Sequence, residues 1–245
     1  MWNNEVWNDP NLWGPPSRDE IINHKTELIQ NITRVPRPLL YIRHIFFIDF
    51  PKYGFREPLY INIARDPVDL FISNYYYLRF GFQSAKNTTN AQNWKRDMTD
   101  ERRNMTVDEC VASDKLECSK PYSNLIPFFC GSGEVCLKRG DKALEIAKRN
   151  VFERYGIVGI MEDFPNTMKA IETVAPRFFL GSSVLYAKAN EALHERSKTA
   201  HKKEPNPETV EYLRNGLKRE YELYNFIKTI LYDKIKFFKE NGLWE

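Results

Sequence analysis

The sequence lacks any apolar run that approaches the roughly 20 residues a membrane-spanning helix needs. Even its most apolar stretch, LLYIRHIFFIDF, carries Arg43 and His44. The opening residues, MWNNEVWNDPNLWGPP, have neither the basic start nor the apolar core of a secretory signal peptide. Internal repeats and low-complexity tracts are also missing. These absences disfavour membrane-spanning and repeat architectures.

A large excess of either charge is missing as well. The chain has 36 Lys and Arg residues against 33 Asp and Glu residues, so its formal net charge is +3. The basic stretch HERSKTAHKKEPNP is short and has no aromatic residues between its charges, which disfavours nucleic acid as a partner. A hydrophobic content of 42% over 245 residues instead predicts one globular domain with a substantial core.

Cysteine spacing disfavours a metal site. Cys110 and Cys118 enclose seven residues and Cys130 and Cys136 enclose five, and neither spacing is the C-x-x-C of zinc or redox motifs. With only four His in the chain, we expect no metal. Two short local disulfides, each within one of these pairs, are favoured and would imply an oxidising compartment. Four reduced, buried cysteines are the alternative.

Three N-x-[ST] sequons, at Asn31, Asn87 and Asn104, are candidate glycosylation sites. The last two fall in the polar stretch 82–106, where a surface loop is expected. Glycosylation and disulfides belong to the secretory pathway, yet the sequence opens without a secretory signal. We therefore expect the chain to be an N-terminally shortened piece of a longer protein.

Hydrophobic periodicity predicts an α/β domain over 18–245, after a poorly ordered segment at 1–17. Strands are expected near 39–46, 60–64 and 156–161. The last two are each followed directly by a helix, which is typical of a mostly parallel sheet.

Other helices are expected near 18–31, over 141–153 and along 210–238. Gly242 suits the position just beyond the end of the last helix. The stretch 82–138 shows little regular pattern.

The stretch YINIARDPVDLFISNYYYLRFG, residues 60–81, changes from strand to helix at Arg65. Asp66 suits the helix N-cap and Pro67 its first position. Ligands of open α/β sheets bind beyond the carboxyl ends of the strands, where helix N-termini attract anions. Arg65 is therefore placed to meet a phosphate, with Ser73 as a second donor. The alternative is that Arg65 only pairs with Asp66 or a nearby loop.

These residues closely resemble the nucleotide-binding strand and helix of the uronyl and heparan sulfate 2-O-sulfotransferases, a family that includes Pipe-type proteins. The resemblance continues in LYIRHIFFIDFPKYG, TVDECVASDKLECSKP, LIPFFCG, ALEIAKRNVFERYGIVGIMEDF and APRFF, and spans roughly 18–240 in order. It implies a P-loop-kinase-like sulfotransferase fold, with a central, mostly parallel sheet flanked by helices and incomplete at the N-terminus. The cysteine spacings match those of the family.

The resemblance implies transfer of a sulfo group from 3′-phosphoadenosine 5′-phosphosulfate to the 2-hydroxyl of a uronic acid in a glycosaminoglycan or related glycan. Arg65 and Ser73 match the residues that hold the 3′-phosphate of the donor. His44 matches the catalytic histidine, and imidazole suits removal of a hydroxyl proton near neutral pH.

Further cations are implied at both substrates. Lys202 and Lys203 match a basic loop beside the donor, while Arg43, Arg79 and Lys198 are expected to face a sulfated, uronate-containing glycan of the chondroitin/dermatan or heparan type. The alternative is that the lysines are solvated residues of a polar linker. Arg43 fits uronyl-type members better than heparan-type members, which have glycine there. After Arg79 the chain reads FQSAKNTTN, where heparan-type members have several arginines.

The chain departs from the family in one respect. Family members carry a P-loop-like K-x-x-S-x-[ST] stretch that cradles the 5′-phosphosulfate, and nothing in the 43 residues before His44 resembles it. Such loops stabilise the charge that develops during transfer, so we expect weak donor binding and poor turnover. The alternative function is a catalytically inactive family member that binds anionic glycan or associates with full-length subunits.

The family also implies a location in the Golgi lumen. The full-length protein would be a type II membrane protein, held by an anchor that is absent from these residues. The sequence leaves open whether the chain forms a homo-oligomer.

Overall fold

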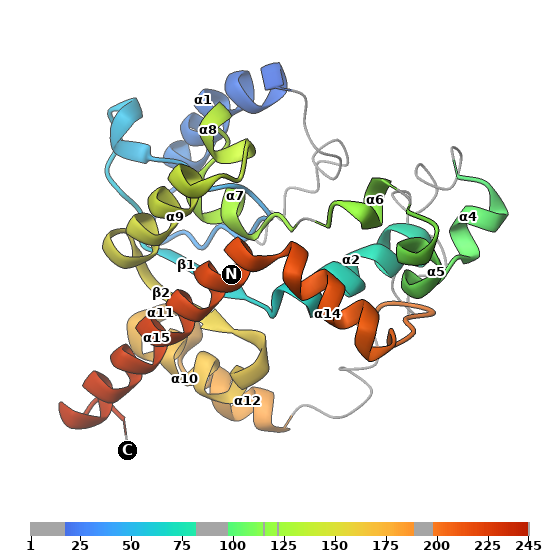
Figure 1. Ribbon diagram of the computed structural model, residues 1–245. Helices are drawn as coiled ribbons and strands as arrows, with labels where there is room; N and C mark the ends of the chain where they lie inside the picture. Colours follow the sequence, from blue (N-terminus) through green and yellow to red (C-terminus); the bar gives the residue numbers. More distant parts are fainter. Residues whose placement is uncertain (1–17, 82–97, 115, 122, 189–197, 245) are drawn as a thin grey trace.

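The computed structural model describes residues 18–81, 98–114, 116–121, 123–188 and 198–244 (Figure 1). At its centre two strands, β1 (Tyr60–Ala64) and β2 (Tyr155–Ile160), run parallel, with Ile61 opposite Ile157. Each strand leads into a helix, α2 (Pro67–Phe80) after β1 and α10 (Phe164–Val174) after β2 and the short turn η3 (Met161–Asp163). The α/β class and the second and third predicted strands are confirmed. The expectation for 1–17 lies outside the described residues.

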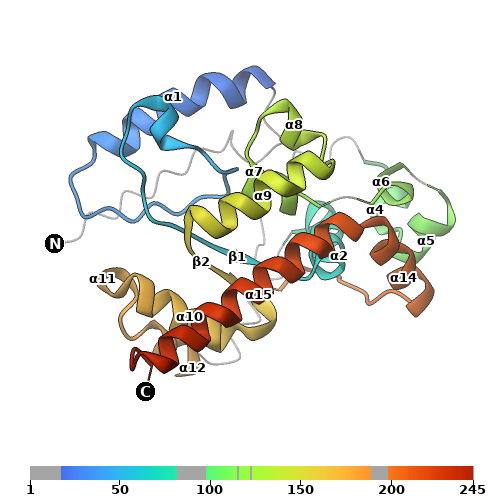
Figure 2. The same ribbon diagram turned by 60° about the vertical axis from the view of Figure 1, so that its left-hand side comes forward.

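Three helices pack against β2. They are α9 (Asp141–Glu153), α10 and the long α15 (Lys218–Glu240), and α15 lies between α9 and α10 in the view of Figure 2. Ile157 and Ile160 of β2 and Leu223, Ile227 and Leu231 of α15 are each 1% exposed or less. Burial of one such side chain is worth about 1.5–3 kcal/mol. The apolar stripe predicted over 210–238 thus forms much of the main core.

A second core surrounds α2. The buried face of α2, which includes Val68, Ile72 and Tyr76, packs with Val107 of α5 (Val107–Ala112) and Leu213 of α14 (Pro207–Gly216). The C-terminal part of the chain therefore contacts both cores, through α14 at one and α15 at the other.

The stretch 82–138, expected to be irregular, contains short helices within its described part. Their four to six residues are too few to show a period, but local caps define them. In α5, for example, Thr106 and Glu109 form a reciprocal capping box. Besides α5, these helices are α4 (Asp100–Asn104), α6 (Leu116–Ser119), α7 (Leu125–Cys130) and α8 (Glu134–Leu137).

The predicted strand at 39–46 is wrong. These residues form an irregular segment between α1 (Arg18–Arg34) and the 3-10 turn η2 (Phe50–Tyr53). The segment has no ladder, and single contacts hold its end: the Phe47 N–H donates to the Phe128 carbonyl at 2.9 Å and the Tyr60 hydroxyl to the Ile48 carbonyl at 2.6 Å. β-prone residues form a strand only where a neighbouring strand offers its edge.

The expected C-terminal helix is divided into α14 and α15 at Leu217. A Cβ on Gly216 would lie 2.3 Å from Pro121 Cγ, so only glycine allows this close approach. Gly242 has φ +67, as predicted for the residue just beyond the helix end. The remaining helices are α11 (Pro176–Phe179) and α12 (Ser182–Lys188).

Both predicted disulfides are present, Cys110–Cys118 with Cα atoms 5.9 Å apart and Cys130–Cys136 with Cα atoms 5.5 Å apart. The first closes the α5–α6 region and the second links α7 to α8. Within the described residues, no helix has the length and apolar character needed to cross a bilayer.

Gly159→Ala should lower the free energy of unfolding by about 1–3 kcal/mol, the usual cost of overpacking a core. The new Cβ would lie 2.1 Å from Thr167 Cγ2. Thr167 is held in place because its Oγ1 accepts from the Ile160 N–H and donates to the Ile160 carbonyl, both at 2.9 Å. Urea unfolding measures the cost, which should fall in a Thr167→Ala background. An equal cost in both backgrounds would contradict this account.

Candidate functional site

Arg65 lies at the carboxyl end of β1, immediately before α2. As predicted, Asp66 is the N-cap of α2: its carboxylate accepts from the Val68 and Asp69 N–H groups at 2.9 and 3.1 Å. Pro67 occupies the first helical position. The strand-to-helix hinge is therefore fixed by local chemistry, and it presents Arg65 at the edge of the sheet.

The carboxyl ends of the two strands are tied together through acidic side chains. The Asp66 N–H donates to Glu162 Oε1 at 2.7 Å. From α15, the Tyr221 hydroxyl donates to the Asp66 carboxylate at 2.8 Å and the Tyr224 hydroxyl to Glu162 Oε2 at 2.7 Å. Farther along α15, the Tyr232 hydroxyl donates to Asp163 Oδ2 at 3.0 Å.

These tyrosines serve as hydrogen-bond donors. Burial, and then the hydrogen bond to Asp66, raise the pKa of Tyr221 to about 12. Burial and the bond to Glu162 likewise raise the pKa of Tyr224 above its ordinary value. The sequence did not reveal this set of hydrogen bonds, because Tyr221 and Tyr224 fit the helical spacing of the apolar residues along 210–238. A buried tyrosine needs a partner for its hydroxyl, and that requirement was the available signal.

Arg65 is only lightly engaged by the protein. Its side chain is 32% exposed, and among the described residues its ion pair is with Asp69, at 3.9 Å. The alternative was that Arg65 only pairs with Asp66 or a nearby loop; the pair found among the described residues is instead with Asp69, since Asp66 is occupied by α2 and Tyr221. A half-exposed pair at that distance is weak, which leaves the guanidinium able to bind an anion.

The basic segment 198–203 lies alongside α2. Ser73 Oγ and Thr199 Oγ1 share a hydrogen bond at 3.1 Å, and the Ala200 N–H donates to the Gly81 carbonyl at 2.9 Å. Ser73 is thus brought next to the segment that carries the predicted lysines. Thr199, which this contact places at the site, was not predicted because nothing in its type or spacing marks it.

The three predicted lysines of this segment differ in their surroundings. Lys198 is exposed. Lys202 pairs with Glu204 at 2.9 Å and is 24% exposed. Lys203 is exposed and lines a cavity beside α2.

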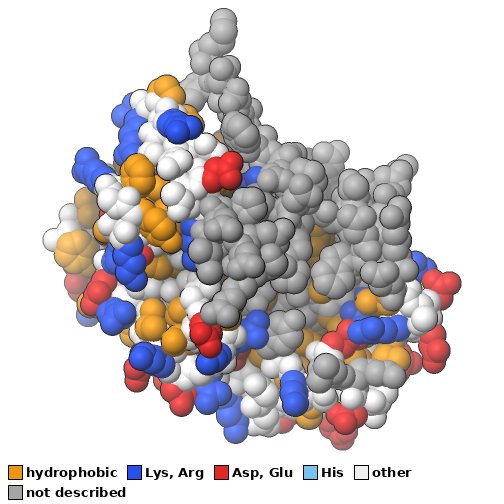
Figure 3. All heavy atoms as spheres, turned by 90° about the horizontal axis from the view of Figure 1, so that it is seen from above, with side chains coloured by type: hydrophobic (Ala, Val, Ile, Leu, Met, Phe, Trp, Pro, Cys, Tyr) orange, Lys and Arg blue, Asp and Glu red, His pale blue; other side chains and the backbone are white. Residues whose placement is uncertain are grey.

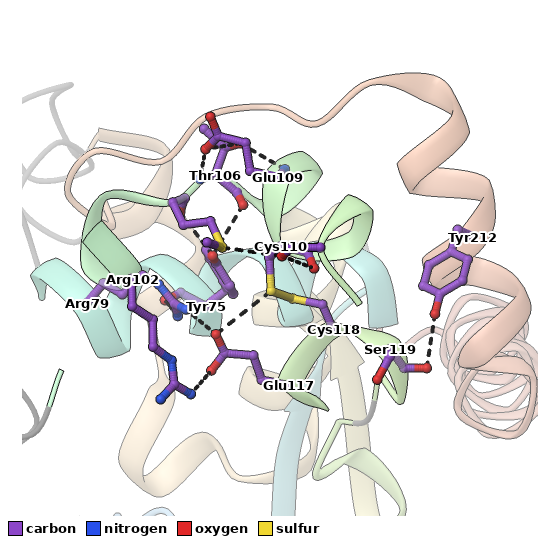
Figure 4. Close-up of a disulfide and its surroundings, with 12 residues drawn as sticks. Tyr75, Arg79, Arg102, Thr106, Glu109, Cys110, Glu117, Cys118, Ser119 and Tyr212 are labelled. Carbon is purple, nitrogen blue, oxygen red and sulfur yellow. Dashed lines mark hydrogen bonds and ion pairs between the residues drawn. A yellow bond between two sulfur atoms is a disulfide. The ribbon is translucent and has the colours of Figure 1, made fainter. Parts of the chain in front are cut away.

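Arg79 does not face solvent, contrary to the expectation of a glycan-facing cation (Figure 4). Its side chain is 3% exposed and its Nη2 donates to Glu117 Oε1 at 2.6 Å. The guanidinium carbon lies 3.4 Å from the centre of the Tyr75 ring. Arg102 bonds the other oxygen of Glu117 at 2.9 Å. Arg79 thus joins α2 to α6 beside the Cys110–Cys118 disulfide.

This cluster changes the titration of its acid. Burial would raise the pKa of Glu117, but the hydrogen bonds and charges of Arg102 and Arg79 outweigh burial and lower that pKa. The charged form of Glu117 is therefore the form that the fold stabilises.

His44 is exposed and lies on the irregular segment 39–49 rather than on a strand. Three residues on, Phe47 is bonded to Phe128 of α7, and Asp49 pairs with Arg154 at 2.8 Å. The contacts that hold the end of this segment thus come from α7, from the end of α9 and, through the Tyr60 bond to Ile48, from β1, the strand that leads to Arg65. The neighbouring Arg43 is partly buried, and its Nε has no hydrogen-bond partner.

Two of the predicted glycosylation positions can be placed. Asn31 is exposed on α1, and Asn104 is exposed at the end of α4. Asn87 lies outside the described residues. Across the described part of the chain, no group of three His, Cys, Asp or Glu side chains converges as a metal site would require.

Charges are mixed on the face shown in Figure 3. Over its described part, Lys and Arg side chains are interspersed with Asp, Glu and hydrophobic groups. Anion recognition there would depend on individual residues rather than on a broad basic field.

The sequence is similar to known sulfotransferases. Uronyl 2-sulfotransferase of Homo sapiens is 36% identical over 208 residues, which are 84% of this chain and 51% of that protein. Heparan sulfate 2-O-sulfotransferase 1 of Gallus gallus is 35% identical over 212 residues, 84% of this chain and 57% of that protein. The chain thus spans about half the length of the curated relatives it matches. No family model matches the sequence.

Glu117→Ala should lower the free energy of unfolding at pH 7 by about 3 kcal/mol, because it leaves the buried Arg79 guanidinium without its counter-charge. The folded state lowers the pKa of Glu117, so its contribution is complete above the unfolded value near 4.5 and is lost as pH falls through the folded value. Denaturant unfolding from pH 7 to pH 3 should show the parent and the variant converging.

Asp100→Ala is the matched control. Asp100 pairs with Arg103 at 3.1 Å, but its carboxylate is 85% exposed, so removing it should cost less than about 1 kcal/mol. A Glu117→Ala cost as small as that of the control, or one independent of pH, would contradict the assigned role.

Proposed function

This chain belongs to the family of the uronyl and heparan sulfate 2-O-sulfotransferases, and we propose that it carries out part or all of the same kind of reaction. In the proposed reaction a sulfo group passes from 3′-phosphoadenosine 5′-phosphosulfate to the 2-hydroxyl of a uronic acid in a glycan. The observation that carries the proposal is the placement of Arg65 at the end of β1, lightly paired and just before the helix α2 that carries Ser73.

Arg65 and Ser73 are the proposed clamp for the 3′-phosphate of the donor. A guanidinium can bond two phosphate oxygens at once, and the N-terminus of α2 adds a favourable dipole. Arg65 precedes α2, and Ser73 lies eight residues later, in the second turn of that helix. The two side chains would therefore approach a bound phosphate from different turns. Lys202 and Lys203, on the segment that Thr199 holds against Ser73, add positive charge beside the donor.

His44 is the proposed general base. It would take the proton of the 2-hydroxyl as that oxygen attacks the sulfur atom. The bond between sulfur and the bridging phosphate oxygen breaks, and 3′-phosphoadenosine 5′-phosphate leaves with the bonding electrons. The exposed position of His44 on an anchored segment supports access by a glycan.

Arg43 and Lys198 are the proposed contacts to the acidic acceptor. Arg43 adjoins the proposed base, and its unbonded Nε supports a role for it toward a ligand. Arg79 is not proposed again because the protein itself uses its charge. An arginine beside the base and the loss of the arginines after Arg79 favour a uronyl-type acceptor, such as chondroitin or dermatan, over heparan.

The two disulfides support an oxidising compartment. We propose the Golgi lumen, where sulfated glycans would meet the protein. Glycans at Asn31, Asn87 and Asn104 are proposed on the same grounds.

Arg65→Ala should weaken binding of 3′-phosphoadenosine 5′-phosphate by about 1.5–3 kcal/mol, the range for a hydrogen bond to a charged group. Binding of adenosine 5′-phosphosulfate, which has no 3′-phosphate, should barely change. Calorimetric titration of both ligands measures the difference.

Asp69→Ala is the control for this substitution. It removes the acid that pairs with Arg65 at 3.9 Å and keeps the guanidinium, so binding of the bisphosphate should hold or tighten. Equal losses for both ligands in Arg65→Ala would show that Arg65 only supports the fold.

The 245-residue chain, assayed as it stands, should show little or no sulfo transfer, because no K-x-x-S-x-[ST] stretch precedes His44 to hold the 5′-phosphosulfate. Preceded by the corresponding segment of a relative, it should transfer sulfate to a uronate-containing glycan. In that form His44→Ala should slow transfer by roughly 10²- to 10⁴-fold with donor affinity unchanged. Transfer unaffected by His44→Ala would refute the assigned base, and no transfer at all would favour a non-catalytic, glycan-binding protein.

A further inference from the structure

A cavity of about 490 Å³ opens beside the C-terminal half of α2. Three separate parts of the chain form it. Its lining residues, besides Thr106, are Tyr76 and Phe80 from α2, Arg103 and Asn104 from the end of α4, and His201 and Lys203 from the segment before α14. The family resemblance gave a role to Lys203 alone among the cationic members of this set.

The cavity has positive charge without a carboxylate among its described lining residues. Arg103 pairs with Asp100 at 3.1 Å, yet that carboxylate is 85% exposed, and the buried Nε of Arg103 has no hydrogen-bond partner. The pKa of the nearby Glu109 is lowered mainly by hydrogen bonds from Thr106, and the charge of Lys203 adds a smaller effect in the same direction. Its carboxylate is already taken up by the Thr106 N–H and hydroxyl, at 2.7 and 2.9 Å. The two cations therefore keep donor capacity for an incoming anion.

One wall of the cavity is aromatic. The Phe80 and His201 rings lie 4.8 Å apart, and Tyr76 and Phe80 are nearly parallel at 6.5 Å. His201 has φ +55, which is uncommon for a residue other than glycine. The adjoining Ala200 N–H bond to Gly81 holds the backbone there. Rings held in this way offer an apolar surface beside the cations.

We propose that this cavity binds a tetrahedral oxyanion carried on a ring, such as the sulfate ester of a sugar or the phosphate of a nucleotide. Arg103 and Lys203 bind the anion through charge-assisted hydrogen bonds. The aromatic wall packs against the ring, and Asn104 and Thr106 provide polar groups at the edge.

The cavity lies beside the proposed donor site and shares Lys203 with it, but its other cation, Arg103, has no role in that site. Ser73 and Phe80 are seven residues apart on α2, or about 10 Å at 1.5 Å per residue, and Arg65 lies farther away at the other end of the helix. Arg103 and Arg65 therefore separate the two proposals, because binding in the cavity should depend on Arg103 and donor binding on Arg65.

The test is calorimetric titration of the chain, produced without N-linked glycans because Asn104 borders the cavity. The probes are glucosamine 6-sulfate, adenosine 5′-monophosphate and, as the neutral comparison, glucosamine. At least one of the two anionic probes should bind, and more tightly than glucosamine. Lys203→Gln and Arg103→Gln should each weaken that probe about tenfold or more. Which anionic probe binds better identifies the source of the anion.

Two control variants separate this site from others. Lys236→Gln alters a lysine on α15 that is 73% exposed, and Arg65→Ala alters the donor clamp, so neither should change probe affinity. Thermal unfolding of each variant shows that it is folded. Absence of binding by both anionic probes, equal binding of the neutral sugar, or sensitivity to Arg65→Ala but not to Arg103→Gln would each overturn the proposal.

Discussion

The hydrogen bond from the Asp66 N–H to Glu162 is the contact on which the arrangement of the candidate site depends. Asp66 caps α2 and Glu162 follows β2, so this single bond joins the element after one strand to the element after the other. Tyr221 and Tyr224 then fasten both acids to α15. With Asp66 occupied by the helix, the strand and α15, the ion pair of the adjacent Arg65 among the described residues is the 3.9 Å pair with Asp69. Because Asp66 and Glu162 are engaged in these bonds, the positive charge of Arg65 is only weakly compensated by them.

Local rules predicted the parts of the fold that depend on neighbouring residues. Asp66 and Pro67 marked the start of α2, Gly242 the end of α15, and cysteine spacing both disulfides. The predictions that failed are those that depend on contacts between residues distant in sequence. The segment 39–46 has the composition of a strand, but it contacts α7 through one backbone bond instead of pairing along an edge. Gly216, the last residue of α14, lies so close to Pro121, nearly a hundred residues earlier, that only glycine fits there.

The same distinction separates the cations of the site. Arg65, Arg79 and Lys203 are all basic residues that the sequence marks as candidates for binding an anionic ligand. In the fold Arg79 is neutralised by Glu117, Arg65 keeps a weak pair, and Lys203 reaches a cavity. Glu117 could not be matched to Arg79 in advance because the pair lies 38 residues apart and depends on the loop closed by Cys110 and Cys118. Residue type identifies the cations that could bind a ligand, and the acidic residues that pair with them in the fold determine which of these cations can still do so.

The irregular course of residues 39–49 bears on how this region can vary in evolution. Inserting or deleting one residue in a strand turns every later side chain to the opposite face. Among the described residues, hydrogen bonds and an ion pair hold this segment near its end, at Phe47, Ile48 and Asp49. A change of length upstream of these anchors would be absorbed before the sheet is reached. Residues upstream of Phe47 can therefore diverge in length while the core stays intact.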